Sequence, residues 1–183
     1  AVTEVERTYQ LSEAVIAYYA GLGRDSIDDN GMAVRSTVRF CLGTCPFANA
    51  YWDGVQMVYG TGYATADDVV AHELTHGVTQ YESNLLYYSD SGAINESLSD
   101  VFGELFDLSF DSSWDDDRPS VAWLLGEDLP GGAIRNMANA RTSAAAVATA
   151  ADPAPTAITL PTCPSITYSR TRSPSRMFSI VIT

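Results

Sequence analysis

The chain contains only two histidines, His72 and His76, and both lie in the short stretch VVAHELTHGVTQYE at residues 69–82. Acidic residues precede this stretch and apolar residues recur along it, a pattern typical of an amphipathic helix. Residues four apart on a helix project from one face, so both imidazoles can reach the same metal ion, with Glu73 beside them. The stretch therefore predicts a helix that carries two ligands of a metal site.

A catalytic zinc site usually needs a third protein ligand. A second amphipathic helix is predicted within residues 93–110, and it presents Glu96 and Asp100 four positions apart on one face. Glu96 can complete the metal site, and Asp100 can accept a hydrogen bond from the far nitrogen of a histidine ligand. The alternative is two ordinary surface histidines and acids on a solvated helix face. The apolar positions of this helix are Ile94, Leu98, Val101, Phe102, Leu105 and Phe106.

The rest of the first 138 residues predicts an α+β domain. Residues 4–20 repeat apolar side chains at helical spacing, and glycines follow them. Residues 33–40 and 49–60 read as strands, the second broken by Asp53-Gly54, and an antiparallel sheet is the simplest arrangement. Thr65 or Asp67 is expected to cap the histidine-bearing helix. The apolar positions of the first helix are Val5, Tyr9, Leu11, Val15, Ile16 and Tyr19.

Composition excludes several classes of partner. The 183 residues carry 23 acidic and ten basic side chains, a net charge of −13, and every basic residue is an arginine, which argues against nucleic acid. The sequence has no run of 18 apolar residues, so no membrane partner is expected. Residues 139–183 differ from the rest: they hold five of the eight prolines, four arginines and a single acid, without a helical or strand period. We treat residues 1–138 as one domain and 139–183 as a tail of unassigned structure.

HELTH followed by GAINESLSD resembles the thermolysin-like family of secreted neutral zinc metallopeptidases, and matching residues extend over about three quarters of the chain. The resemblance implies a zincin fold, with an antiparallel sheet packed on the metal-binding helix and a second helix that carries the third ligand. It also implies a monomeric, extracellular endopeptidase that cleaves peptides or proteins on the amino side of bulky hydrophobic residues. In such an enzyme His72, His76 and Glu96 would hold Zn²⁺. Glu73 would activate the zinc-bound water, and Asp100 would orient His72.

The same resemblance assigns residues that contact substrate. Tyr87 would stabilise the oxyanion, and Arg135 would bind a substrate carbonyl. Asn49 and Ala50 would form the edge on which the peptide lies. Without the family, the simpler interpretations are a packed aromatic for Tyr87, a surface ion-pair partner for Arg135 and a turn residue for Asn49. Two apolar residues would help line the pocket for the side chain after the scissile bond, Val69 and Ile134.

The chain also departs from the family pattern. Relatives carry a further histidine in a C-terminal helical lobe, whereas this chain has no third histidine and no stretch like GGVHINSG, so that lobe is expected to be missing. Residues beyond about 139 could be a divergent, truncated or out-of-frame ending, or a short natural tail. A second candidate function follows, a catalytically impaired metal-binding fragment. A third is a non-enzymatic helical domain with fortuitous histidines.

The resemblance further suggests a Ca²⁺ site. Ala122 and Leu124 stand where relatives have two more acidic ligands, so we expect one ion at most, and a solvated acidic loop is the alternative. The candidate ligands are Asp68, Asp107 and Glu127, with help from Asp115, Asp116 and Asp117. The pair Cys41 and Cys45 could form a disulfide or remain as two thiols in a turn, and the extracellular location implied by the family favours the disulfide. The state of Cys163 stays open.

Overall fold

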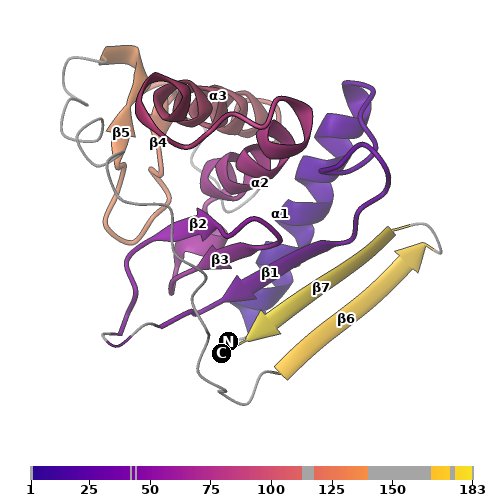
Figure 1. The fold of residues 1–183 in the computed structure, drawn as a ribbon. Coiled ribbons are helices and arrows are strands. Elements are labelled where there is room, and N and C mark those ends of the chain that lie inside the picture. The colour runs from indigo at the N-terminus through magenta and orange to yellow at the C-terminus, as the bar shows by residue number, and fades with distance from the viewer. Residues whose placement is uncertain are drawn as a thin grey trace.

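The computed structural model describes residues 2–41, 43, 45–112, 118–139, 166–173 and 176–182. Figure 1 shows helix α2 lying between helix α3 and a sheet, with α1 packed against both α2 and the sheet. The α+β class predicted from the sequence is therefore confirmed. In chain order the elements are α1 (Val2–Gly21), β1 (Val34–Val38), β2 (Ala50–Trp52), β3 (Met57–Tyr59), η1 (Tyr63–Thr65), α2 (Asp67–Glu82), α3 (Ser89–Asp107), β4 (Leu124–Leu125), β5 (Arg135–Asn136), η2 (Met137–Asn139), β6 (Ile166–Ser173) and β7 (Arg176–Ile182).

The sheet is mixed, which corrects the expectation of an antiparallel sheet. Its strand order is β2-β3-β1-β7-β6. The chain leaves β1, runs to β2 at the edge of the sheet and returns as β3 between β2 and β1. As a result β3 is antiparallel to β2 but parallel to β1. A parallel pair needs a longer connection than a hairpin, and residues 39–56 supply it.

Residues 166–182, which no sequence period assigns to an element, extend this sheet by two strands. β7 runs parallel to β1, with Val34 opposite Phe178, and β6 is antiparallel to β7. Apart from Asn139 in η2, the remaining residues of the predicted tail, including Cys163, lie outside the described part of the chain. The small sheet of β4 and β5 is separate and follows α3.

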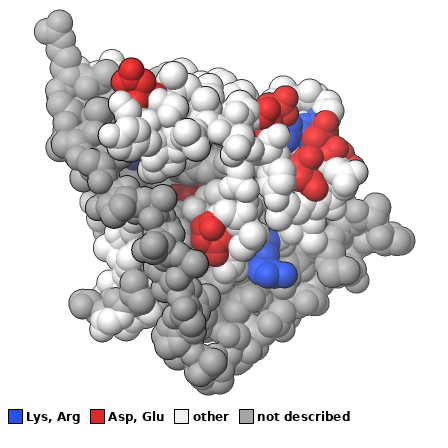
Figure 2. All heavy atoms as spheres, viewed as in Figure 1, with Lys and Arg blue, Asp and Glu red and all other residues white. Residues whose placement is uncertain are grey.

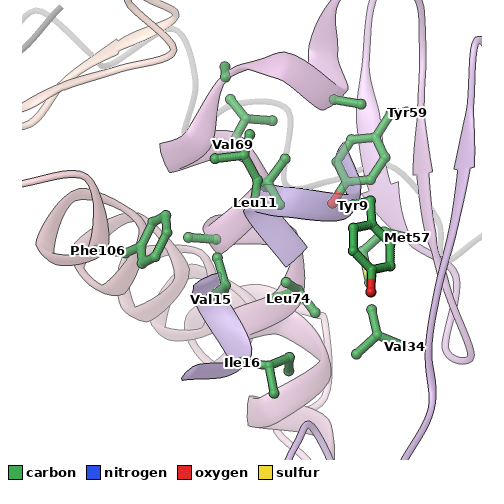
Figure 3. Packing of buried hydrophobic residues seen from close by; sticks show 14 of the residues in the cluster. Tyr9, Leu11, Val15, Ile16, Val34, Met57, Tyr59, Val69, Leu74 and Phe106 are labelled. Atoms are coloured by element: carbon green, nitrogen blue, oxygen red, sulfur yellow. The ribbon is translucent and has the colours of Figure 1, made fainter. Parts of the chain in front are cut away.

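The core lies between α1, α2 and the sheet (Figure 3). All six apolar positions predicted for the first helix are buried, which confirms its period of 3.6 residues. α1 ends at Gly21, and Gly23 then adopts the left-handed conformation with φ +92°. The N-cap of α2 is Ala66, which forms no side-chain capping hydrogen bond. The prediction that Thr65 or Asp67 caps this helix is therefore wrong. Thr65 instead donates its hydroxyl to the carbonyl of Gly62.

α3 begins at Ser89, earlier than predicted, and its apolar positions divide between two faces. Phe106 is buried and Phe102 packs against the core, where these aromatic rings meet Tyr18 and Tyr19. The other predicted positions face outward, and we call them, with Leu108, the α3 stripe. Their exposed fractions range from 37% to 52%, and they recur every three or four residues: Ile94, Leu98, Val101, Leu105 and Leu108.

Candidate metal centre

α2 and α3 bring three potential metal ligands together. The Nε2 atoms of His72 and His76 lie 2.9 Å apart, as expected for two residues one turn apart on one helix face. The carboxylate of Glu96 on α3 lies 3.5 Å from Nε2 of His72 and 3.3 Å from Nε2 of His76. One ligand atom from each residue lies within 4.8 Å of the others. Two imidazoles and one carboxylate form a donor set that suits zinc, with room for a fourth ligand.

The second nitrogen of each histidine also has a partner on α3. Nδ1 of His72 lies 2.9 Å from Oδ1 of Asp100. Nδ1 of His76 lies 2.7 Å from Oδ1 of Asn95 and 3.1 Å from Oγ of Ser99. Such contacts hold an imidazole in the orientation and tautomer needed for a metal ligand. We did not predict these roles of Asn95 and Ser99 from the sequence. The signal that could have indicated them is their spacing of four, since each directly precedes one of the two predicted acids.

Glu73 is buried beside the histidines, with only 5% of its surface exposed. Its Oε2 atom is also buried, and no described residue forms a hydrogen bond to it. Burial raises the pKa of Glu73, and the charge of Glu96 acts in the same direction, whereas the charges of the two histidines and Arg135 oppose the shift. A raised pKa moves a carboxylate toward the range of a general base that works near neutral pH.

The three potential metal ligands form a charge-paired cluster. Burial alone would lower the pKa of His76, but its hydrogen bond with Glu96 and the charges of Glu73 and Glu96 raise the pKa to about 9. Burial would raise the pKa of Glu96, yet the hydrogen bond and charge of His76, together with the charge of His72, lower it overall. The raised pKa of His76 favours its protonated form, so protons compete with a metal ion for this site.

Two further predicted residues lie next to Glu96. The hydroxyl of Tyr87 donates a hydrogen bond to Oε1 of Glu96, and Tyr87 is 42% exposed. Arg135, on β5, places Nη1 3.7 Å from Oε2 of Glu96 and donates a 2.6 Å hydrogen bond from Nη2 to Oδ1 of Asp100. Both polar groups therefore lie within reach of a molecule bound at the metal site.

The predicted substrate-binding residues lie on three different elements. Asn49 is exposed directly before β2, and its carbonyl accepts a 2.9 Å hydrogen bond from the backbone N–H of Gly60. Ala50 begins β2, which is an outer strand of the sheet and pairs with β3 on one side. Val69, on α2, is buried in the core (Figure 3), whereas Ile134, just before β5, is 49% exposed.

A second group of acids lies at the start of α2. Carboxylate oxygens of Asp67, Asp68 and Glu127 lie within 4.8 Å of one another, so the structure adds Asp67 to the predicted set. Asp107 is buried and close enough for its charge to raise the pKa of Glu127. Burial raises the pKa values of both Asp68 and Glu127. The charges of Glu104 and Asp128 add to the shift of Asp68, and the charge of Asp68 adds to that of Glu127. Residues 115–117, expected to help here, lie outside the described residues.

Backbone groups of the loop after α3 contact this acidic group. The N–H of Gly126 donates a hydrogen bond to Asp68, and the N–H of Trp123 donates one to Glu104. Glu104 is fully buried, and burial raises its pKa. Glu104 was not among the residues predicted from the sequence. The one feature that could have indicated it is its position one helical turn beyond Asp100. Trp123 lies between Ala122 and Leu124, the two positions where the expected acids are absent, and Gly126 lies two residues after Leu124.

Three further observations concern the described residues outside these two sites. Cys41 and Cys45 are joined in a disulfide, which decides between the two states left open by the sequence. Figure 2 shows, among the described residues on this face, acidic side chains in separate patches and fewer basic ones. Among the helices of the described residues, none combines the length and apolarity needed to cross a bilayer.

Comparison with known proteins places these features in one family. Residues 2–80 match the profile of the thermolysin metallopeptidase catalytic domain, and residues 83–159 match that of the thermolysin metallopeptidase alpha-helical domain. A zinc metalloproteinase of Renibacterium salmoninarum is 43% identical over 152 residues, which are 74% of this chain and 27% of that protein. A thermolysin of Alicyclobacillus acidocaldarius is 38% identical over 153 residues, or 72% of this chain and 26% of the relative.

A solved structure agrees with the sequence comparison. The precursor of protealysin, a metalloproteinase from Serratia proteamaculans, aligns with a TM-score of 0.62 and 33% identity, covering 75% of this chain and 45% of that one. The chain thus spans about a quarter of the length of the relatives it matches in sequence. Since both profiles of one family follow each other along the sequence and the fold agrees, the chain belongs to the thermolysin metallopeptidase family.

Proposed function

We propose that the chain carries the zinc site of a metalloendopeptidase that hydrolyses peptide bonds. The observation that carries this proposal is the convergence of His72, His76 and Glu96, with Asp100 and Asn95 holding the outer nitrogens of the two histidines. A Zn²⁺ ion held by these three residues would supply a Lewis acid and a water of lowered pKa.

The roles of the neighbouring side chains follow from their positions. Glu73 would accept a proton from the attacking water and return it to the leaving amine, because its buried carboxylate has a raised pKa and an oxygen without a partner among the described residues. Tyr87 now donates to Glu96, and Arg135 donates to Asp100. Each would donate instead to an oxygen of the bound substrate. Removal of one such donor typically costs about 10²- to 10³-fold in rate.

The substrate would be an extended peptide added to the outer edge of β2, beginning at Asn49 and Ala50. A strand that pairs on one side has backbone N–H and C=O groups available for another strand, which is a common mode of peptide recognition. We assign the preference for a bulky hydrophobic residue after the scissile bond to Val69 and Ile134. The other proposed properties are a monomer, an extracellular location supported by the Cys41–Cys45 disulfide, and a division into residues 1–138 and 139–183.

Zinc content and peptide cleavage test the proposed activity. Native mass spectrometry should show one bound zinc, removed by a chelator, in the wild type and in Glu73→Gln. A peptide with one bulky hydrophobic residue should be cut before that residue by the wild type and not by Glu73→Gln. Glu82→Gln is a matched control on the same helix, because Glu82 is 68% exposed, forms an ion pair with Arg24 and is not one of the proposed site residues. Absence of zinc at micromolar metal would refute the proposal.

A specific observation favours the second candidate, a metal-binding fragment that turns over little substrate. The α3 stripe is exposed, although apolar helix faces of this kind are normally covered in a folded protein. If the wild type and Glu73→Gln both bind zinc and are equally inert, this second function holds and the peptidase proposal fails.

We also propose one Ca²⁺ site, formed by Asp67, Asp68 and Glu127 with Asp107 nearby. No neighbouring side chain among the described residues donates a hydrogen bond to the buried carboxylate oxygens of Glu127. Clustered carboxylates with raised pKa values are stabilised when a hard divalent cation joins them. Calorimetric titration of the zinc-loaded protein with Ca²⁺ should show one binding site. A titration without binding heat would instead favour an acidic group whose hydrogen bonds come from the backbone N–H groups of the loop after α3.

A further inference from the structure

The side chain of Gln80, on α2, forms hydrogen bonds both with β2 and with the turn that follows it. Nε1 of Trp52, the last residue of β2, donates a 2.8 Å hydrogen bond to Oε1 of Gln80. Nε2 of Gln80 donates a 3.2 Å hydrogen bond to the carbonyl of Gly54, in the turn after β2. Both ends of one amide are therefore used, one on the strand and one on its turn.

The turn itself does not need Gln80. Oδ1 of Asp53 accepts hydrogen bonds from the backbone N–H groups of Val55 and Gln56, at 2.8 Å each. The N–H of Asp53 donates a 3.0 Å hydrogen bond to the carbonyl of Gln56. Because these local bonds already close the turn, the contacts of Gln80 serve to attach β2 and its turn to α2.

The attachment point lies next to the metal ligands. Gln80 is one helical turn beyond His76 on α2, and Gly77 lies between them. A Cβ atom at Gly77 would stand 3.4 Å from the ring of Trp52, so the indole rests directly on the helix backbone beside His76. β2 has only three residues and pairs with β3 alone, so its own ladder constrains its position weakly.

We propose that Gln80 is a positioning residue that keeps the peptide-binding edge of β2 at a constant distance from the metal centre, acting through Trp52. This inference rests on the proposed function, since it takes β2 as the strand to which an extended peptide adds. Gln80 does not contact the reacting atoms. Its loss should therefore weaken peptide binding and leave the chemical step of a bound peptide nearly unchanged.

The test compares Gln80→Leu with Gln10→Leu, the same substitution at an exposed position of α1. In Gln80→Leu, KM for the peptide should rise about tenfold, equivalent to about 1.4 kcal/mol, while kcat stays within about twofold. Zinc content by native mass spectrometry should not change. Gln10→Leu should match the wild type in all three measurements.

A second readout does not depend on activity. In ¹H–¹⁵N NMR spectra, the indole N–H of Trp52 should exchange with solvent slowly in the wild type and in Gln80→Glu, which retains the acceptor. It should exchange rapidly in Gln80→Leu. Equal indole exchange in all three proteins, or a fall in kcat without a rise in KM, would overturn the inference. If the wild type cleaves no peptide, the proposed function fails, while the indole exchange still shows whether Gln80 holds the strand.

Discussion

At Gly103, α3 packs closely against α2, and replacing this glycine tests how the metal site is assembled. A Cβ atom at this position would lie 2.8 Å from the backbone carbonyl oxygen of Asp68 and 3.5 Å from Cβ of His72. Neither neighbour can rotate away, because one is helix backbone and the other is the first side-chain atom of a proposed ligand. Since ordinary contact begins at 3.4 Å, Gly103→Ala must separate the helices locally by about 0.6 Å.

Two opposing terms decide the stability of this variant. Alanine in place of glycine within a helix gains about 0.5–1 kcal/mol, whereas overpacking costs about 1–3 kcal/mol. We therefore expect a net loss of about 1 kcal/mol in the free energy of unfolding. Metal–ligand distances are normally held within about 0.2 Å, so a shift of about 0.6 Å between the histidine helix and the Glu96 helix should weaken zinc binding about tenfold or more.

Competition with a chromophoric chelator measures the zinc affinity, and urea unfolding of the metal-free protein measures the stability. The control is Gly21→Ala at the end of α1, where a Cβ atom would meet nothing within 4 Å. The control should retain its zinc affinity and lose no stability. If Gly103→Ala binds zinc within twofold of the wild type and is as stable as Gly21→Ala, close packing of the two helices does not set the ligand geometry.

Three further predictions follow from individual side chains. Asn95→Ala should weaken zinc binding about 10- to 100-fold in the same competition assay, because His76 loses the 2.7 Å partner of its Nδ1; an unchanged affinity would contradict this role. Burial raises the pKa of Tyr19 to about 12 from 10, against the opposing effect of its 2.6 Å hydrogen bond with Thr75. The contribution of this shift to the free energy of unfolding is complete below pH 10 and falls by roughly 3 kcal/mol as the pH rises through 12. The free energy of unfolding of Tyr19→Phe, measured in urea, should therefore decline less steeply over this range. Ca²⁺ at about 100 times its Kd should add about 2.7 kcal/mol to the free energy of unfolding, and Glu127→Gln should abolish this gain in thermal melts of the zinc-loaded protein.

Local spacing accounts for what could be predicted about the site. His72 and His76 lie on one helix face because four residues make about one turn, and the same rule places Glu96 above Asp100. The partners of His76 could not be assigned in the same way, although Asp100 was predicted as the partner of His72. Asn95 and Ser99 reach His76 only because of the angle and depth at which α3 packs on α2, and no period within either segment encodes that angle.

Local spacing likewise did not predict the strand directions of the sheet or the exposure of the α3 stripe. Sequence patterns identified α1, α2, α3 and two strand regions, which form β1, β2 and β3, but the direction of β3 relative to β1 depended on which strand the chain reached first. A period of 3.6 also cannot tell which of two apolar faces turns inward, and on α3 the core takes Phe102 and Phe106 while the stripe remains outside.

By itself, the sequence determined which residues can bind a metal and which helix faces they occupy, because helical geometry acts over a few neighbouring residues. Only the tertiary structure decided that α3 brings Glu96 to both histidines, that an amide of Asn95 orients His76 and that Gln80 holds the edge strand. Each of these contacts joins elements whose relative positions depend on core packing between segments distant in sequence. Such packing is a property of the whole domain, so no short stretch of residues can specify it.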